Sequence, residues 1–175
     1  GSEMCIRDRG FTWQQQAGYN YVMEKHCIGS LFYTLEQTSR VCRAVGENYF
    51  AENAKLHLSL DEFIILETVL CDSDICQRDL AKRILKGTSH TSKLLSGLQQ
   101  KGLIERFVDT KGNRIVKKIV VTEKGREIYD FANKIMFEYV QKIENAIGKE
   151  QAIECTNFLN KIKEVVMANT DIIFE

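Results

Sequence analysis

The sequence contains no proline and carries no net charge, because 24 basic residues balance 24 acidic ones. Without proline, the ends of helices have to be set by glycine and by capping side chains. No apolar run approaches the roughly 20 residues that span a bilayer. Residues 1–18 also lack the apolar stretch of a secretion signal. We therefore expect a cytoplasmic protein that makes no contact with a membrane.

Motifs for metal binding and catalysis are also missing. The six cysteines include no CxxC pair, and the three histidines include no pair at helical spacing. The cysteines are too scattered for a disulfide scaffold, so most are expected to be reduced thiols. There is no nucleophile elbow, phosphate-binding loop or dinucleotide-binding glycine motif. We expect no metal, no cofactor and no enzymatic activity.

The two ends of the chain differ from its middle. Residues 1–18 begin with GSEMCIRDRG, which has no periodicity and starts with the Gly-Ser typical of a tag remnant. They are expected to be a partly tag-derived or disordered extension. Apolar residues at helical spacing predict long amphipathic helices over 20–52, 123–147 and 149–169. We expect residues 19–55 and 123–175 to form a helical dimerisation region around a domain at 56–122.

The domain at 56–122 begins with three predicted helices. Ser59 and Glu62 form the ends of a capping box, which opens the apolar helix FIILETVL and predicts a central position for it. A second helix is predicted from about Cys76, which would stand in for a Ser or Thr cap. The third is predicted from about Thr88 to Lys101, with Gly102 as its C-terminal stop.

Two strands follow these helices. Leu103-Ile104 and then Ile115 to Val121 are rich in β-branched and apolar residues. Between them, the stretch DTKGNR at 109–114 is predicted to be a hairpin tip, because glycine and asparagine tolerate positive φ. The predicted fold is mainly α with a small β-hairpin: a winged helix-turn-helix and a helical dimerisation region.

The charge is unevenly distributed. Residues 78–118 hold 11 basic and 3 acidic residues, a net charge of +8, which leaves −8 for the remainder. A basic block within a neutral chain is typical of a phosphate-binding face. The alternative interpretation is an ordinary solvated surface.

The start of the third helix favours the first interpretation. A helix fits the major groove of DNA and presents its N-terminal residues to the base edges. This one begins with short or hydrogen-bonding side chains: Thr88, Ser89, His90, Thr91, Ser92 and Lys93. Polar residues at a helix start can be mere caps, and either Thr88 or Ser89 is expected to be one. These six polar residues are more than a helix cap requires. Lys111 and Arg114 at the hairpin tip could reach the DNA backbone or minor groove.

Several stretches together resemble the MarR family of bacterial winged-helix regulators over about residues 20–170. They are LSLDEFIILETVL, QRDLAKRI, SHTSKLLSGLQQKGLIERFVDTKGNR and IVVTEKGREIYD. The resemblance implies an obligate homodimer with intertwined terminal helices. Each recognition helix of that dimer would read half of a near-palindromic operator in double-stranded DNA, and repression would be the usual outcome. The long apolar stripes support a dimer independently.

The resemblance also assigns roles to residues. It places base contacts at Ser89, His90, Ser92 and Lys93, a wing contact at Arg114, and Asp109 as a group that orients nearby basic side chains. The sequence departs from the family at GNRIV, where the wing tip usually carries two arginines. Gly87, before the recognition helix, is also unusual and could loosen the turn.

Release from DNA in this family follows binding of a small aromatic or anionic ligand, or thiol oxidation. Cys27, in MEKHCIGSLFY, resembles the sensing cysteine of the redox branch, and His26 and Lys25 could lower its pKa. The alternative is a small residue at the edge of an apolar stripe. For the whole chain, the competing hypothesis is a winged-helix protein-interaction module that does not bind DNA.

Overall fold

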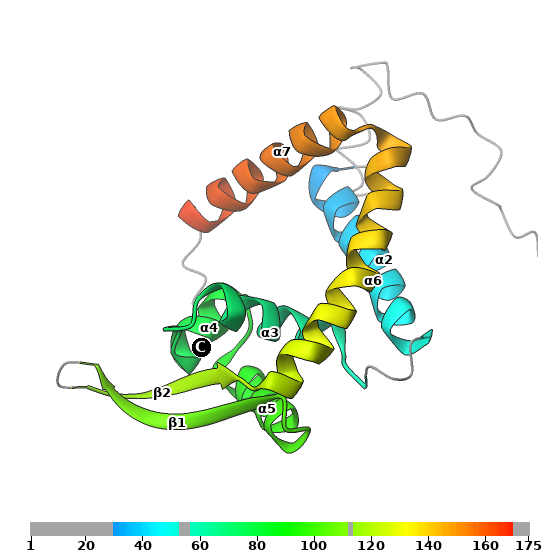
Figure 1. The fold of residues 1–175 in the computed structure, drawn as a ribbon. Coiled ribbons are helices and arrows are strands. Elements are labelled where there is room, and N and C mark those ends of the chain that lie inside the picture. Colours follow the sequence, from blue (N-terminus) through cyan, green and yellow to red (C-terminus); the bar gives the residue numbers. More distant parts are fainter. Residues whose placement is uncertain (1–29, 53–56, 112–113, 170–175) are drawn as a thin grey trace, which may run out of the picture. The chain divides into compact units, whose positions relative to one another are not determined.

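The structure is a computed structural model that describes residues 30–52, 57–111 and 114–169, with Lys111 and Arg114 described by their backbone alone. Figure 1 shows the elements in chain order: α2 (Leu31–Glu52), α3 (Leu60–Cys71), α4 (Gln77–Arg83), α5 (Thr88–Gln100), β1 (Ile104–Lys111), β2 (Arg114–Val121), α6 (Glu123–Ile147) and α7 (Lys149–Ala168). The predicted order of helices and strands over the central domain is confirmed. None of these helices meets the length and hydropathy of a membrane span.

The chain divides into two compact units, with the boundary between Val45 and Gly46. In the first unit, the Ser30 Oγ accepts a hydrogen bond of 3.2 Å from the backbone N–H of Tyr33, and α2 starts at Leu31. The helix predicted over 20–52 is therefore present from Leu31, and the residues before Ser30 lie outside the described part. Cys42, on this helix, is exposed in the single chain.

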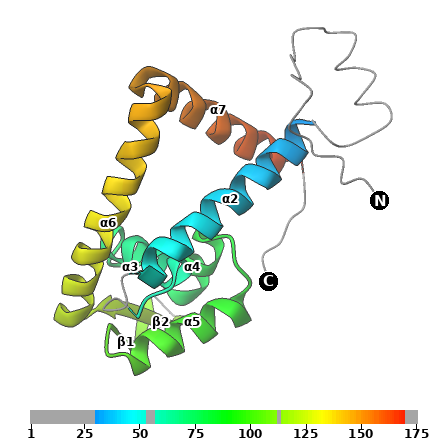
Figure 2. The same cartoon turned by 90° about the vertical axis from the view of Figure 1, so that its right-hand side faces the viewer.

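The second unit contains the winged helix, which is organised around α3. The predicted capping box is present: Ser59 Oγ accepts from the Glu62 N–H at 3.2 Å, and Glu62 Oε2 accepts from the Ser59 N–H at 2.9 Å. The helix that it opens is almost entirely apolar and lies at the centre of the core, as predicted. The fully buried side chains around it come from each neighbouring element: Ile65, Leu66, Leu80, Leu95, Leu98, Ile104 and Ile119. Figure 2 shows α3, α4 and α5 clustered together, with the hairpin extending away from the viewer behind them.

The turn between α4 and α5 departs from the prediction. Leu85 takes the left-handed conformation at φ +54°, whereas Gly87 has φ −61° and ψ 150°, which any residue can adopt. The N-cap of α5 is Gly87, and neither Thr88 nor Ser89 caps the helix. The Thr91 Oγ1 instead donates to the Gly87 carbonyl at 3.0 Å. The polar residues at the start of α5 are therefore not needed as caps.

β1 and β2 form one antiparallel hairpin, in register from Ile104 opposite Val121 to Lys111 opposite Arg114. Pairing continues beyond Asp109, so the strands are longer and the tip shorter than predicted. An isolated bridge between Cys76 and Lys118 joins the start of α4 to the outer edge of β2. The hairpin therefore extends from the three-helix core as a wing (Figure 1).

The end of α5 is joined to the start of α6 by hydrogen bonds. Gly102 ends the recognition helix at φ +71°, as predicted, and its carbonyl accepts from Thr122 Oγ1 at 2.8 Å. The same hydroxyl accepts from the Gly125 N–H at 3.0 Å, which makes Thr122 the cap of α6. Gly125 is buried here, and a Cβ on it would lie 2.1 Å from the Leu103 carbonyl oxygen. Only glycine allows this close approach.

α6 packs on α3 through aromatic contacts and then leaves the core. Phe63 of α3 lies between Phe50, with ring centroids 5.5 Å apart, and Tyr129 of α6, with centroids 5.4 Å apart and nearly parallel rings. Burial is the main cause that raises the pKa of Tyr129. Gly148, at φ +93°, separates α6 from α7, and no residue of α7 is buried.

We predict that Gly125→Ala destabilises the protein much more than Gly102→Ala. The first adds a methyl group against a backbone oxygen, which should cost about 2 kcal/mol or more. The methyl group of Gly102→Ala would contact no atom within 4 Å, so the only cost is that of a left-handed backbone at alanine, about 1 kcal/mol. Urea unfolding at one fixed protein concentration measures both. Equal losses would show that the close approach at Gly125 does not exist.

Candidate nucleic-acid interface

Helix α5 has one edge that is buried in the core, the locked edge, and one edge that is exposed to solvent, the open edge. Thr91, Leu95 and Leu98 are completely buried, which fixes the rotation of the helix about its axis. Most of the predicted contact residues lie on the open edge: Thr88, Ser89, His90 and Lys93 are exposed and Ser92 is half-buried. The open edge is polar and begins at the N-terminus of the helix, where backbone N–H groups also favour anions.

A partly buried ion pair fixes the other end of α5. Lys101 Nζ lies 2.7 Å from both carboxylate oxygens of Glu62 and donates to the His57 carbonyl at 2.8 Å. The side chain of Glu62 is only 8% exposed, while that of Lys101 is 37% exposed. The glutamate of the α3 capping box is thus also the anchor of the recognition helix.

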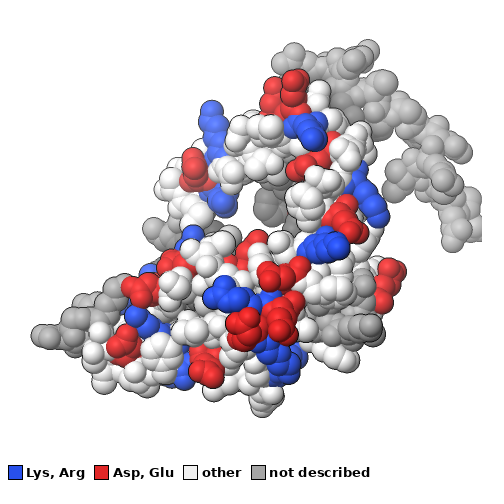
Figure 3. Space-filling view, viewed as in Figure 1, with Lys and Arg blue, Asp and Glu red and all other residues white. Residues whose placement is uncertain are grey.

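The basic block is partly neutralised by acidic residues that precede it in the sequence. Four of its cations form ion pairs with carboxylates from outside the block: Arg83 with Asp72, Lys86 with Asp61, Lys101 with Glu62 and Lys118 with Asp74. In Figure 3, Lys and Arg accordingly lie among Asp and Glu on the face shown. The net charge of +8 overstates the positive charge available to a partner.

Few cations of the block remain available. Within the described part of the chain, no carboxylate pairs with Lys82, Lys93 or Lys117, and Arg78 is 4.0 Å from Asp79. Arg106 is held by Gln99 at 2.7 Å and Ser96 at 3.2 Å, which ties β1 to α5. Lys93 is therefore the predicted contact residue whose charge is visibly free.

Asp109 lies in an ion-pair chain on the wing. Lys118 Nζ is 2.7 Å from Asp74 Oδ1 and 3.1 Å from Asp109 Oδ2, so it connects the wing with the turn before α4. The hydrogen bond from Lys118 and one from the Thr110 N–H lower the pKa of Asp109. The two carboxylates raise the pKa of Lys118. Both groups are therefore charged across the neutral range, and the bridge is lost in acid, as Asp109 protonates, or in strong alkali, as Lys118 loses its proton.

His90 lies near a second pair. Its Nε2 is 3.9 Å from Asp61 Oδ2, which accepts from Lys86 Nζ at 2.8 Å. The imidazole is 54% exposed, so it can still reach a partner in front of α5. The Lys86–Asp61 pair also fixes the turn before the helix.

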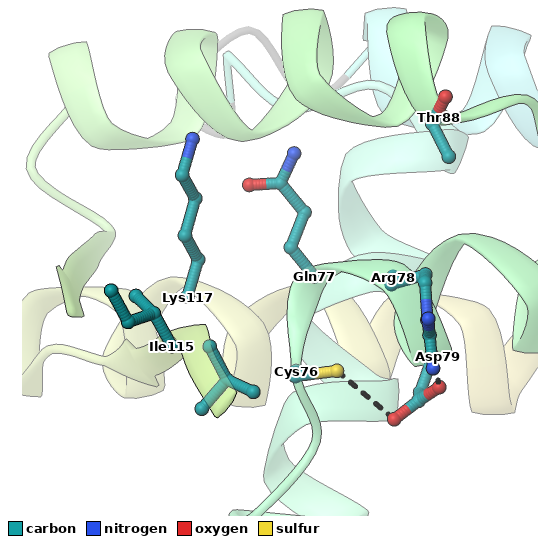
Figure 4. Close-up of a pocket in the computed structure, with 8 residues that line it drawn as sticks. Cys76, Gln77, Arg78, Asp79, Thr88, Ile115 and Lys117 are labelled. Carbon is teal, nitrogen blue, oxygen red and sulfur yellow. Dashed lines mark hydrogen bonds and ion pairs between the residues drawn. The ribbon is translucent and has the colours of Figure 1, made fainter. Parts of the chain in front are cut away.

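A hollow of about 650 Å³ separates the start of α5 from the wing. Its lining comes from three elements: Cys76, Gln77, Arg78, Asp79, Thr88, Ile115, Val116 and Lys117. Figure 4 shows the Cys76 thiol turned toward Asp79, whose Oδ2 accepts from it at 2.9 Å. Cys76 occupies the N-cap position as predicted, yet its side chain does not cap the backbone.

Sequence reasoning missed Arg78, Gln77 and Lys117 as parts of this surface. The alternation of β2 could have identified Lys117, because residues two apart on a strand share a face. Lys111 and Arg114 face each other across the hairpin by their backbones, and their side chains are outside the described part. Cys27 also lies outside it.

No cluster of three or more potential metal ligands occurs within the described ranges. What the geometry offers instead is a protruding polar helix edge, a free lysine on it and a wing beside it. Such a surface suits an extended, anionic and hydrogen-bonding partner rather than a small substrate.

Comparison with known proteins supports this fold. Models of known protein families give no match. Among curated proteins, the chain is 25% identical over 95 residues to YybA of Bacillus subtilis, an uncharacterized HTH-type transcriptional regulator; the match covers 54% of this chain and 63% of that protein. The chain thus spans less than two thirds of this relative's length.

Solved structures give broader matches. The transcriptional regulator BldR from Sulfolobus solfataricus is 27% identical, with a TM-score of 0.67 over 77% of this chain and 92% of that one. The S. aureus MepR–DNA complex is 20% identical, with a TM-score of 0.67 over 78% and 96%. The ligand-free organohalide-sensing regulator RdhR is 19% identical, with a TM-score of 0.68 over 97% and 92%.

The two structures below 25% identity speak for the fold alone, whereas BldR and YybA are also similar in sequence. Both are transcriptional regulators, which agrees with the interpretation of the motifs in the capping box, α5, the wing and the start of α6. The fold of this chain is therefore that of the winged helix-turn-helix transcriptional regulators, and these similarities support the resemblance of its motifs to the MarR family.

Proposed function

We propose that this protein is a homodimeric, sequence-specific regulator of transcription that binds double-stranded DNA at a near-palindromic operator and represses in the cytoplasm. Thr88, Ser89, His90, Ser92 and Lys93 contact bases and phosphates in the major groove, and the wing with Lys111 and Arg114 contacts the neighbouring backbone. No catalytic step is required of any residue.

One observation carries the proposal: the polar edge of α5 is open along its first turns while its apolar edge is locked. A recognition helix needs both properties. Its side chains must project from the surface to contact bases, and the rotation of the helix about its axis must be fixed so that each side chain meets the correct base. Lys93 adds an unpaired charge on the same edge. The wing, held by Lys118, lies across a hollow of about 650 Å³ from the start of α5.

Exposed apolar side chains support the dimer. α7 has no buried residue, and large apolar groups on α6 and α7 are exposed in the single chain: Phe131, Phe137, Ile153, Phe158 and Leu159. Surfaces of this kind are rare on monomers and typical of obligate interfaces. A two-fold assembly would bury them and set two recognition helices about 34–36 Å apart.

We also propose that a signal releases the protein from DNA. RdhR has been solved with 2,4-dichlorophenol bound and NadR with 4-hydroxyphenylacetate. A small aromatic or anionic ligand is therefore one candidate for this chain. Oxidation of Cys27 is the other, since a thiol near cationic side chains is easily activated.

The first prediction concerns Lys93. Binding of the parent protein to duplex DNA should weaken steeply as salt rises, because several phosphates are contacted. Lys93→Ala should reduce the slope of log K against log salt by about one for each protomer bound. Lys134→Ala, an equal change of charge at an exposed position of α6, should leave the slope unchanged. Fluorescence anisotropy with a labelled duplex measures all three.

Two outcomes would argue against DNA contact by α5. If Lys93→Ala and Lys134→Ala behave alike, the recognition helix does not face the phosphates. If the parent protein shows no salt dependence, the winged helix is an interaction module for another protein.

The second prediction concerns the assembly. Light scattering coupled to gel filtration should give twice the 20.1 kDa mass of the chain. Ile153→Glu with Phe158→Glu places two charges on the apolar face of α7 and should shift the mass toward one chain or cause aggregation. Gln141→Glu, at an exposed polar position of α6, should remain dimeric. A parent protein with the mass of a single chain refutes the dimer.

The third prediction concerns Cys27. After peroxide treatment, the parent protein should leave a bound operator duplex, while Cys27→Ser should stay bound. Cys71→Ser removes an exposed thiol at the end of α3 and should respond as the parent does. Release of Cys27→Ser by peroxide at the parent's rate would exclude this thiol as the sensor.

A further inference from the structure

The outer half of the wing carries apolar side chains where a solvated hairpin would be polar. Ile115 is 78% exposed and Val108 is 68% exposed, which makes them two of the most exposed large apolar residues of the winged helix. Neither contributes to the core. β-branched residues suit a strand, yet threonine would serve that purpose without exposing so much apolar surface.

The register places both side chains on one face of the hairpin. Opposite residues of an antiparallel pair share a face, and every second residue returns to it. Ile104 opposite Val121 defines the face that is buried in the core. Continuing outward, the same face presents Val108 opposite Lys117 and then Thr110 opposite Ile115.

This face is turned toward the recognition helix. Arg106, on the same face, donates to Gln99 and Ser96 of α5. Ile115 and Lys117 line the hollow beside Thr88, together with Val116 between them. The two apolar groups therefore lie next to a free lysine, on the side from which α5 projects. The opposite face also exposes Phe107 and Val120, but to a smaller extent, and it carries the Lys118–Asp109 bridge.

We propose that Val108 and Ile115 form an apolar wing contact that packs against the deoxyribose edges of a DNA minor groove. This proposal rests on the proposed function and deepens it. When α5 lies in a major groove, the wing reaches the adjacent minor groove. The walls of that groove are sugars, whose carbon edges are the apolar part of the DNA backbone. Lys117, next to the two apolar side chains, would lie at the level of the phosphates.

The contact gives the wing a preference for sequence without a hydrogen bond to a base. Guanine places an amino donor in the minor groove, whereas A·T pairs present acceptors only. Branched apolar side chains cannot satisfy that donor, and covering it would leave it without its water partner. The flanks of the operator, outside the major-groove half-sites, should therefore favour A·T pairs.

The test uses the full-length dimer and a duplex selected in vitro by the parent protein. The combined variant Val108→Thr and Ile115→Thr replaces apolar surface with polar groups; threonine has the shape of valine and is one methyl group smaller than isoleucine. We expect its affinity to fall roughly three- to tenfold per protomer, with the salt slope unchanged. Lys117→Gln should instead reduce the salt slope by about one per protomer.

Val120→Thr is the matched control, because Val120 is 44% exposed on the same strand but on the opposite face. It should bind as the parent does. Replacing A·T by G·C in the flanks should weaken the parent and leave the Thr variant almost unaffected. Thermal unfolding should show equal stability for all of these proteins, since the substituted side chains lie outside the core.

The outcomes separate this inference from the proposed function. If the parent binds duplex DNA with a steep salt slope but the Thr variant matches Val120→Thr, the apolar contact is refuted and DNA binding stands. If the variant's salt slope falls with its affinity, the wing contact is ionic and the proposal is wrong. If the parent binds no duplex, both fail together.

Discussion

The ion pair between Glu62 and Lys101 is the interaction on which the rest of the structure depends. Glu62 closes the capping box that starts α3, and the same carboxylate holds Lys101 at the end of α5. A nearly buried carboxylate without its cation is costly, so the pair acts as a positional constraint between the two helices. It connects the helix that forms the core with the helix that is exposed to the partner. α5 can present a polar edge because its other edge and its far end are both fixed.

The constraint extends from α5 into α6. Gly102 and Leu103 supply carbonyls to Thr122, and the close approach at Gly125 leaves no space between α6 and the segment after α5. The recognition helix and the first turns of α6 should therefore move as one body. α6 and α7 carry the exposed apolar surface proposed for dimerisation, so a change in dimer geometry would directly alter the spacing of the two recognition helices. A regulator can use this connection without any change inside the winged helix.

Local sequence signals predicted the parts of the fold that depend on local contacts. The capping box at Ser59, the stop at Gly102, the cap at Thr122 and the apolar edge of α5 all follow from spacings of a few residues. The N-cap of α5 did not, because Thr88 has the right chemistry but Gly87 takes the position. The charge pattern misled more seriously. Asp61, Glu62 and Asp74 neutralise cations 25 to 44 residues away, and only the folded chain brings them together. The apolar wing residues were read only as strand formers, since their exposure depends on where the hairpin leaves the core.

The central claim is that two copies of α5 enter successive major grooves on one side of a duplex. Chemical footprinting of the parent protein on a selected operator tests it most directly, with guanine N7 methylation for the major groove and hydroxyl radicals for the sugars. We expect two protected major-groove segments about one helical turn apart, each flanked on its outer side by protected sugars. A single protected segment, or protection confined to the sugars, would contradict the claim.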